Sequence, residues 1–121
     1  MPEAPTDRQV IKQLFSNPTG RNLLAIWYRV TGSRFPMSVV CDLLGTNEET
    51  AESKIQVMSG LGLANIVTDS KGERIVDFLI CPNDELVVTI EDFLDSRKGE
   101  FDKVEAKVRS LLYLTLLNYP V

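Results

Sequence analysis

The stretch that most limits the fold is residues 36–62, because it holds two short helical patterns with almost no chain between them. The segment FPMSVVCDLLG predicts a helix that begins near Pro36 and ends at Gly45. Thr46 lies three residues before Glu49, a spacing that predicts a capping box at the start of a second helix. Two helices joined this tightly must cross at a large angle, which is the helix-turn-helix arrangement.

The periodicity changes at Leu63, where the pattern becomes typical of strands. The runs LANIVTD and ERIVDFLIC are rich in β-branched residues and flank DSKGE, whose Gly72 suits a tight turn. They predict a β-hairpin over residues 63–81, which in this position is a wing. Residues 36–81 therefore predict a winged helix-turn-helix with a two-stranded β-wing.

Further helices are predicted on both sides of this unit. Thr6 and Gln9 have the spacing of a capping box, and Asn17 followed by Pro18 marks the start of the next helix. The expected helices outside the central unit cover residues 6–15, 17–32, 84–97 and 100–118. We therefore expect an α+β, mainly α fold in a single winged-helix domain over residues 1–121, with an additional C-terminal dimerisation helix.

Composition argues against several classes of function. The chain has no histidine, which removes the commonest general base and the commonest transition-metal ligand, and it has no Gly-rich phosphate loop, so we expect no enzyme. The first ten residues lack the pattern of a secretory signal, and no apolar run is long enough to cross a bilayer. These features predict a cytoplasmic protein without a membrane partner. The formal charge of −4 provides no overall attraction to nucleic acid.

Two cysteines, Cys41 and Cys81, are too few for a disulfide scaffold and lie among apolar residues. We expect both to be reduced and buried, because no basic neighbour in the sequence favours a thiolate; a redox pair is the alternative. Trp27, Tyr28 and Phe35 could line an effector pocket. A Trp on the apolar side of a helix is nevertheless expected in the core.

Three segments form an ordered set: LFSNPTGRNLLAIWYRV, MSVVCDLLGTNEETAESKIQVMSGLGLANIV and GERIVDFLI. They are similar to the opening helix, the helix-turn-helix with its Leu-Gly-Leu exit, and the second wing strand of the ArsR-type winged-helix transcriptional regulators. The chain resembles that family over residues 14 to about 95. The resemblance implies a homodimer that pairs through its outer helices and inserts two recognition helices into successive major grooves of double-stranded DNA. It also implies an effector that changes DNA affinity.

The metal-site motifs of that family are missing from this sequence. Its metal-sensing members carry Cys-x-Cys-Asp-Leu in the first helix of the helix-turn-helix, whereas this chain has VVCDL, with Val39 in place of the first thiol. Other members place Asp and His ligands on the following long helix, where this chain reads ELVVTIEDFLDS. One thiol without imidazoles cannot complete a tetrahedral site, so we predict no metal sensing and no cofactor.

The outward positions of the second helix are the first candidates for contact with DNA. Thr50, Ser53 and Gln56 are ordinary hydrogen-bonding readers of base edges, and a glutamate such as Glu52 can accept from cytosine N4. Cations for phosphate contacts are scattered; they could form one positive face or lie on an ordinary solvated surface. The predicted DNA-binding residues are Thr50, Glu52, Ser53, Lys54, Gln56, Lys71, Arg74, Arg21 and Arg34.

Three glutamates near the start of that helix oppose the negative charge of DNA. The capping box explains Glu49, and the helix dipole explains Glu48, since negative charge is favourable at a helix N-terminus. Glu52 has no such explanation in the sequence. It leaves a second interpretation open, in which the chain is a winged-helix protein–protein interaction module with a protein partner and has lost DNA binding.

The last helical pattern carries more apolar residues than one buried face needs. Its second half, LLYLTLL, has hardly any polar side, and in a chain this short a second copy is the expected cover. The predicted homodimer interface consists of Phe101, Val104, Val108, Leu111, Leu112 and Thr115. The sequence thus predicts a homodimeric DNA-binding transcriptional regulator without metal sensing.

Overall fold

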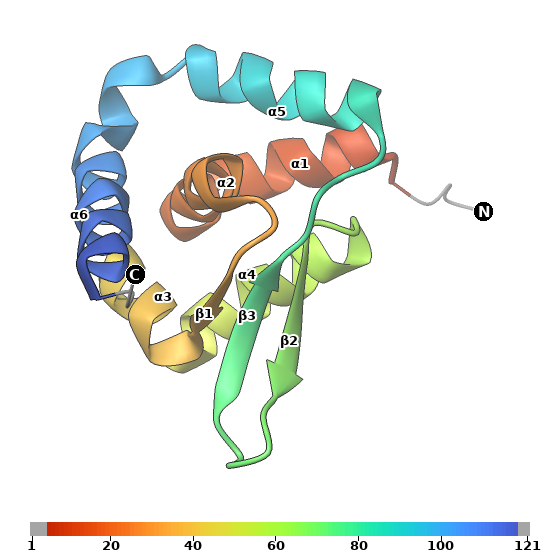
Figure 1. Cartoon of the computed structure of the whole chain (residues 1–121). Helices are drawn as coiled ribbons and strands as arrows, with labels where there is room; N and C mark the ends of the chain where they lie inside the picture. Colours follow the sequence, from red (N-terminus) through yellow and green to blue (C-terminus); the bar gives the residue numbers. More distant parts are fainter. Residues whose placement is uncertain (1–4, 119–121) are drawn as a thin grey trace.

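The computed structural model of the chain describes residues 5–118, and their side chains as far as residue 113. Within this range it contains six α-helices and a three-stranded antiparallel sheet (Figure 1). In chain order the elements are α1 (Asp7–Ser16), α2 (Pro18–Val30), β1 (Arg34–Pro36), α3 (Met37–Leu44), α4 (Glu48–Gly60), β2 (Ala64–Thr68), β3 (Arg74–Phe78), α5 (Asp84–Asp95), a 3-10 turn η1 (Lys98–Phe101) and α6 (Asp102–Asn118). The mainly α, α+β fold expected from the sequence is confirmed.

Local capping signals place the first two helices. The Thr6 hydroxyl accepts a hydrogen bond from the Gln9 amide at 3.2 Å, and the Gln9 side chain accepts one from the Thr6 amide at 2.9 Å, so the predicted capping box is present. Asn17 caps α2 by accepting from the amides of Thr19 and Gly20, with Pro18 in the first turn. Each cap satisfies amides that the helix itself leaves without partners.

The second predicted capping box, between Thr46 and Glu49, is wrong. Asn47 is the N-cap of α4, and its side chain accepts from the Thr50 amide at 2.8 Å. The Thr46 amide instead donates to the Cys41 carbonyl at 3.2 Å, and so it still belongs to the end of α3. Gly45, with a φ of 67°, makes the left-handed turn that separates the two helices.

The predicted hairpin is present, and a third strand extends its sheet. β2 pairs antiparallel with β3, with Ile66 opposite Val76, and Gly72 takes a φ of 81° in the turn between them. β1 pairs with the other edge of β3 and sets Phe35 opposite Val76, which gives the strand order β1-β3-β2. β1 has only three residues and ends in a proline, so the sequence contains no strand periodicity from which it could be predicted.

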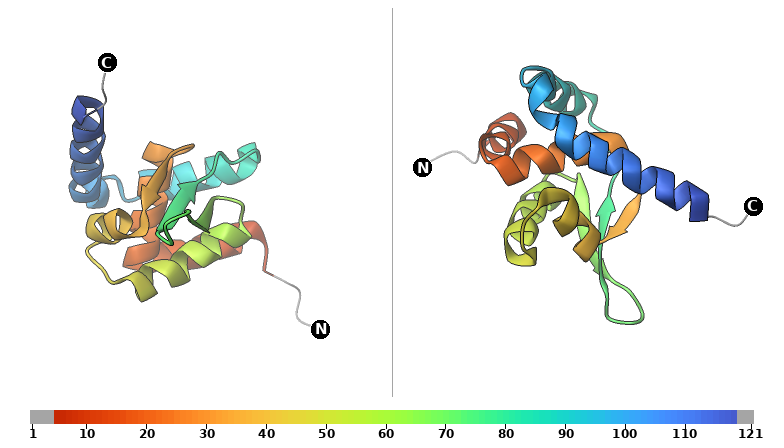
Figure 2. Two further views of the ribbon diagram at one scale, coloured as in Figure 1. Left: turned by 60° about the horizontal axis from the view of Figure 1, so that its bottom comes forward. Right: turned by 90° about the vertical axis from the view of Figure 1, so that its left-hand side faces the viewer.

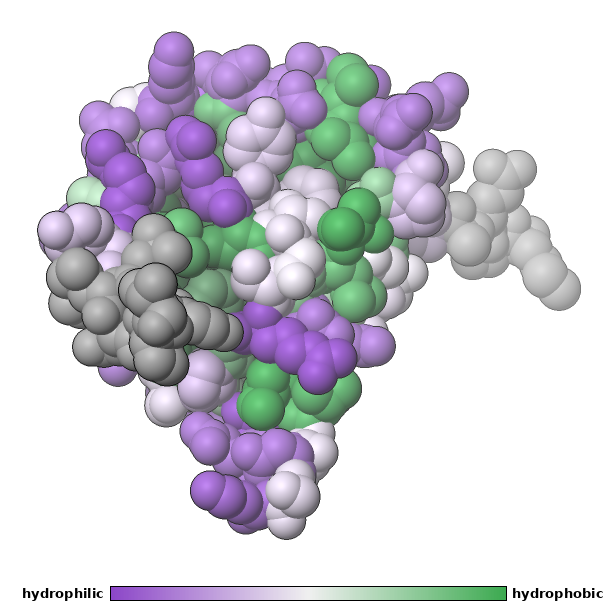
Figure 3. All heavy atoms as spheres, viewed as in Figure 1, coloured by the Kyte–Doolittle hydropathy of each residue, from purple (hydrophilic) through white to green (hydrophobic). Residues whose placement is uncertain are grey.

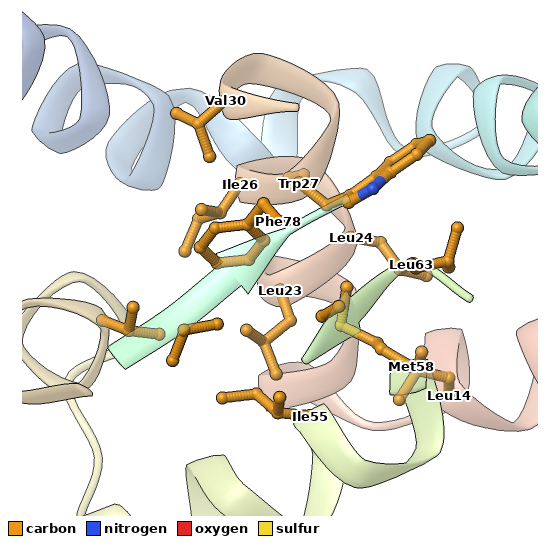
Figure 4. Close-up of a cluster of buried hydrophobic side chains, with 14 of the residues drawn as sticks. Leu14, Leu23, Leu24, Ile26, Trp27, Val30, Ile55, Met58, Leu63 and Phe78 are labelled. Carbon is orange, nitrogen blue, oxygen red and sulfur yellow. The ribbon is translucent and has the colours of Figure 1, made fainter. Parts of the chain in front are cut away.

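The core lies between α2, α4 and the sheet. The inner side of α4 consists of Ala51, Ile55 and Met58, all of them fully buried. Figure 4 shows Ile55 and Met58 pointing towards Leu23 and Leu24 of α2. This packing fixes which side of α4 faces away from the molecule.

Trp27 is a core residue, as expected. The residue is 2% exposed, and its indole nitrogen donates to the Leu79 carbonyl at 2.8 Å. Phe35 is also buried, whereas Tyr28 lies on the surface. The three aromatic residues therefore do not form one pocket.

Three of the six residues predicted for the dimer interface belong to the core of the chain itself. Phe101, at the end of η1, is 3% exposed and its ring contacts that of Phe15. Val104 and Val108 are 6% and 2% exposed because this side of α6 packs against the rest of the chain, mainly α2 and α3. Apolar spacing alone does not distinguish a core face from an interface, which is why the sequence grouped them with the rest. Leu111 and Leu112 are half-buried, and the side chain of Thr115 lies outside the described residues.

Candidate nucleic-acid interface

The outer side of α4 is not covered by any other element in the described part of the chain. Ser53 and Gln56 are exposed, while Thr50 and Lys54 are half-buried at the edges of this side. Because Ala51, Ile55 and Met58 hold the opposite side in the core, these polar groups face outwards together. The structure therefore brings five of the predicted DNA-binding residues, including Glu52, onto one helix.

The β2–β3 hairpin projects beside this helix, as both views in Figure 2 show. Its turn is held by Asp69, whose side chain accepts from the amides of Lys71 and Glu73 at 2.9 and 2.8 Å. Hydrophilic residues cover the tip of the hairpin (Figure 3). Lys71 lies in this turn and forms no ion pair within the described range.

An open groove of about 350 Å³ runs between α4 and the hairpin. Its polar lining consists of Glu52, Gln56, Ser59, Asn65, Thr68 and Arg74. The Ser59 hydroxyl of α4 donates to the side-chain carbonyl oxygen of Asn65 on β2 at 3.1 Å, so a hydrogen bond joins the two walls of the groove. The groove thus continues the polar outer side of α4 onto the wing.

Arg74 at the start of β3 binds two glutamates of α4. Its Nη1 lies 2.7 Å from Glu48 Oε1 and 3.0 Å from Glu52 Oε2, and its Nη2 lies 2.5 Å from Glu52 Oε1. The pair with Glu52 is bidentate, the strongest arrangement of an arginine and a carboxylate. This corrects the interpretation of Glu52 as a residue without a structural explanation, because its partner lies 22 positions away in the sequence.

The remaining predicted cations are divided between two regions. Arg34 on β1 lies 3.4 Å from Asp77 of the neighbouring strand and remains 66% exposed. Arg21 donates to the carbonyls of Phe15 and Ser16 and lies 3.6 Å from Glu100, so it links α2 to the end of α1 and to η1. The structure places Arg34 and Arg74 on the sheet and Lys71 in the hairpin turn, and it does not bring Arg21 together with them.

Acidic residues outnumber basic ones on the helix-turn-helix and wing. Between residues 37 and 78 the chain has seven acidic and three basic residues. The acidic residues are Asp42, Glu48, Glu49, Glu52, Asp69, Glu73 and Asp77, and the basic residues are Lys54, Lys71 and Arg74. Since Arg74 is already paired with two of these acids, Lys54 and Lys71 are the cations of this segment without a salt bridge in the described structure. Electrostatic attraction to a polyanion is therefore weak on this side.

The Arg74–Glu52 pair makes stability depend on pH. Hydrogen bonds from Arg74 lower the pKa of the Glu52 carboxyl from its ordinary value of 4.5; partial burial opposes this shift, and the charge of Arg74 adds to it. A carboxyl with a lowered folded-state pKa stabilises the fold above its unfolded pKa, and that contribution is lost as the pH falls through the folded value. We expect Glu52→Gln to lower the urea midpoint near neutral pH, with a difference from wild type that shrinks once the pH falls below about 4.5 and is lost as the pH passes through the lowered folded-state pKa of Glu52.

Glu49→Gln is the matched control for this measurement. It removes a carboxylate from the first turn of the same helix, but Glu49 forms no ion pair with the described residues. Its urea midpoint should stay closer to wild type near neutral pH. Equal losses in the two variants at every pH would contradict a specific role for the Arg74 pair.

Neither cysteine lies in an environment that favours reactivity. Cys41 is half-buried, and the pKa of its thiol is raised by burial and by the nearby charges of Glu48 and Asp42. Cys81 is buried, and its sulfur donates to the Asn83 carbonyl at 3.7 Å. Because the thiolate is the reactive form, this environment gives no support to the redox alternative.

The described residues contain no cluster of three or more His, Cys, Asp or Glu side chains arranged to hold a metal ion. Within the same residues, no helix is both long and apolar enough to span a bilayer.

No protein-family model matches the sequence, and no curated protein is similar to it in sequence. Among solved structures, the chain is similar to an ArsR family transcriptional regulator, with a TM-score of 0.50 and 16% identity over 84% of this chain and 97% of that one. The fold is a winged helix. This winged helix also aligns with the YusO protein from Bacillus subtilis, at a TM-score of 0.47 and 10% identity over 94% of this chain and 70% of that one. A MarR family transcriptional regulator from Silicibacter pomeroyi aligns at 0.48 and 14% identity, over 95% and 83%.

Proposed function

We propose that this protein is a homodimeric winged-helix regulator of transcription that binds double-stranded DNA in the cytoplasm and senses no metal. The observation that supports this most is the outer side of α4, which no described element covers. Thr50, Ser53 and Gln56 present hydroxyl and amide groups there, and such groups bond base edges in a major groove. Lys54 and Lys71 are available for phosphates on either side of them.

The proposed dimer forms through the C-terminal part of α6. This helix packs on the chain through Val104 and Val108, and its C-terminal end extends beyond the other helices (Figure 2). Tyr113, in that end, is 64% exposed. The sequence around it, LLYLTLL, has almost no polar side chains. We therefore propose that a second copy of the chain covers this apolar segment.

A titration of random-sequence duplex DNA at several salt concentrations tests the proposed function. We expect binding at micromolar concentrations or tighter in low salt, with a logarithm of the binding constant that falls as salt rises by about 0.9 for each phosphate contacted. Lys71→Gln should reduce the magnitude of that slope by about 1 per protomer, because it removes one phosphate contact. No detectable binding of any duplex at low salt would overturn the proposal.

Lys98→Gln serves as the control for Lys71→Gln. Both changes remove one exposed lysine charge, but Lys98 lies in η1, at the end of the molecule opposite the hairpin (Figure 1). It should leave the salt slope unchanged. A slope that falls equally in both variants would indicate a general charge effect instead of contact through the wing.

A second function is supported by the charge of this side. Seven acids against three bases over residues 37–78, with Arg74 bound by Glu48 and Glu52, suit a basic protein partner better than a polyanion. Under this alternative the chain is an interaction module that has lost DNA binding. The same titration separates the two, since only the module predicts no binding at low salt.

A further inference from the structure

Arg74 forms a different number of hydrogen bonds with each of its two glutamates. Glu48 receives one bond, to Nη1 at 2.7 Å, and its side chain is 52% exposed. Glu52 receives bonds from both terminal nitrogens and is 31% exposed. The contact with Glu48 is thus the one more open to water and to an approaching phosphate, while Glu52 is held in a fixed orientation.

A bidentate arginine removes two obstacles to the approach of Glu52 to DNA. It neutralises the charge that phosphates would otherwise repel, and it fixes the carboxylate so that no side-chain freedom is lost on binding. Gln56, one turn further along α4, points its amide nitrogen at Glu52 Oε1 from 3.5 Å. An ionised carboxylate has about four acceptor positions, so these three bonds leave one free.

A fixed carboxylate acceptor distinguishes the four bases in a major groove. Cytosine presents the N4 amino donor, whereas guanine presents only the O6 and N7 acceptors and thymine presents O4, which repel a carboxylate. Adenine offers its N6 amino group, but the N7 acceptor lies beside it. The carboxylate is therefore repelled by the acceptors of the other three bases, and cytosine remains as its preferred partner.

We propose that Glu52, held by Arg74, is a specificity-determining residue that selects cytosine at one position of each half-site. Glu48 has a different role: a phosphate replaces it as the acceptor of one N–H of Arg74 Nη1, while the other N–H of Nη1 and the Nη2 group keep Glu52 in place. This inference rests on the proposed function, because it requires α4 to enter a major groove.

The test selects bound duplexes from a randomised library with wild type, Glu52→Gln, Glu48→Gln and Glu49→Gln. Wild type should enrich cytosine at one position per half-site, and replacing that cytosine by thymine should weaken binding about tenfold to a hundredfold. Glu52→Gln should lose this preference, since an amide both donates and accepts, while still binding random duplex as tightly as wild type or more tightly. Glu48→Gln should keep the cytosine preference and bind random duplex more tightly.

Glu49→Gln removes the same charge from the first turn of the same helix, and Glu49 forms no ion pair with Arg74, so this variant should keep the preference for cytosine. Retention of that preference in Glu52→Gln, or its loss in Glu49→Gln, would overturn the assignment to Glu52. Wild type that binds duplex without enriching cytosine would overturn this inference alone. Wild type that binds no duplex would overturn the proposed function and the inference with it.

Discussion

Replacing Gly20 with alanine should destabilise the fold more than any other single-methyl addition to a described glycine. A Cβ built at this position lies 2.1 Å from the carbonyl oxygen of Leu14 and 2.9 Å from its carbonyl carbon, far inside van der Waals contact. The obstacle is backbone, so α1 and α2 must move apart to accept the methyl group. Overpacking of this kind costs about 1–3 kcal/mol and occasionally more, and we expect the loss at the upper end of that range or above it.

Urea denaturation followed by circular dichroism measures the loss, and Gly60→Ala is the control. Gly60 is also helical, at the end of α4, and a Cβ there meets nothing within 4 Å. The same substitution should be neutral or stabilise by up to about 1 kcal/mol, because alanine favours the helix. A Gly20→Ala protein as stable as wild type would contradict the close contact between α1 and α2 at this position.

Tyr113→Glu should convert the proposed dimer into a monomer. Tyr113 is exposed on the part of α6 that extends beyond the other helices, so the substitution leaves the core of the chain untouched. In a dimer it would introduce a carboxylate into an apolar interface, where burial of a charge without a partner is costly. Two linked half-sites bind about 10²–10⁴-fold more tightly than one, and the monomer should lose that advantage on operator DNA.

Sedimentation at micromolar concentration measures the mass, with Ala106→Glu as the matched control. Ala106 is exposed on the same helix two turns earlier, beside the body of the chain, and the change adds the same charge. We expect wild type and Ala106→Glu to sediment as dimers and Tyr113→Glu as a monomer. Wild type that sediments as a monomer would contradict the proposed dimer.

The helices and the hairpin could be predicted because their signals are local. Thr6 with Gln9, Asn17 with Pro18, and Gly72 each determine the backbone within a few residues of themselves. The N-cap of α4 was harder to predict, because Thr46 and Asn47 are adjacent and either residue type can cap a helix. Thr46 is bonded to the end of α3, so Asn47 becomes the cap. β1 was missed because its pairing with β3 joins residues about forty positions apart.

The candidate site was predicted less completely than the fold. Helical periodicity identified the outer side of α4, including Ser53 and Gln56, but it could not indicate that Arg74 binds Glu52 across the groove. It also could not separate Val104, which packs within the chain, from residues available to a partner. Both failures concern contacts between elements distant in sequence, which periodicity does not record.

The short strand β1 has a mechanical consequence. It is hydrogen-bonded along β3 and runs directly into α3, whose N-cap is Pro36, so the root of the hairpin and the start of the helix-turn-helix share one piece of backbone. Bending of the hairpin relative to α3 would require breaking the hydrogen bonds between β1 and β3. The hairpin and α3 therefore move as one rigid unit. In the proposed dimer, the distance between the two hairpins would therefore change through rotation of one protomer against the other, because neither hairpin can bend independently of its own helix-turn-helix.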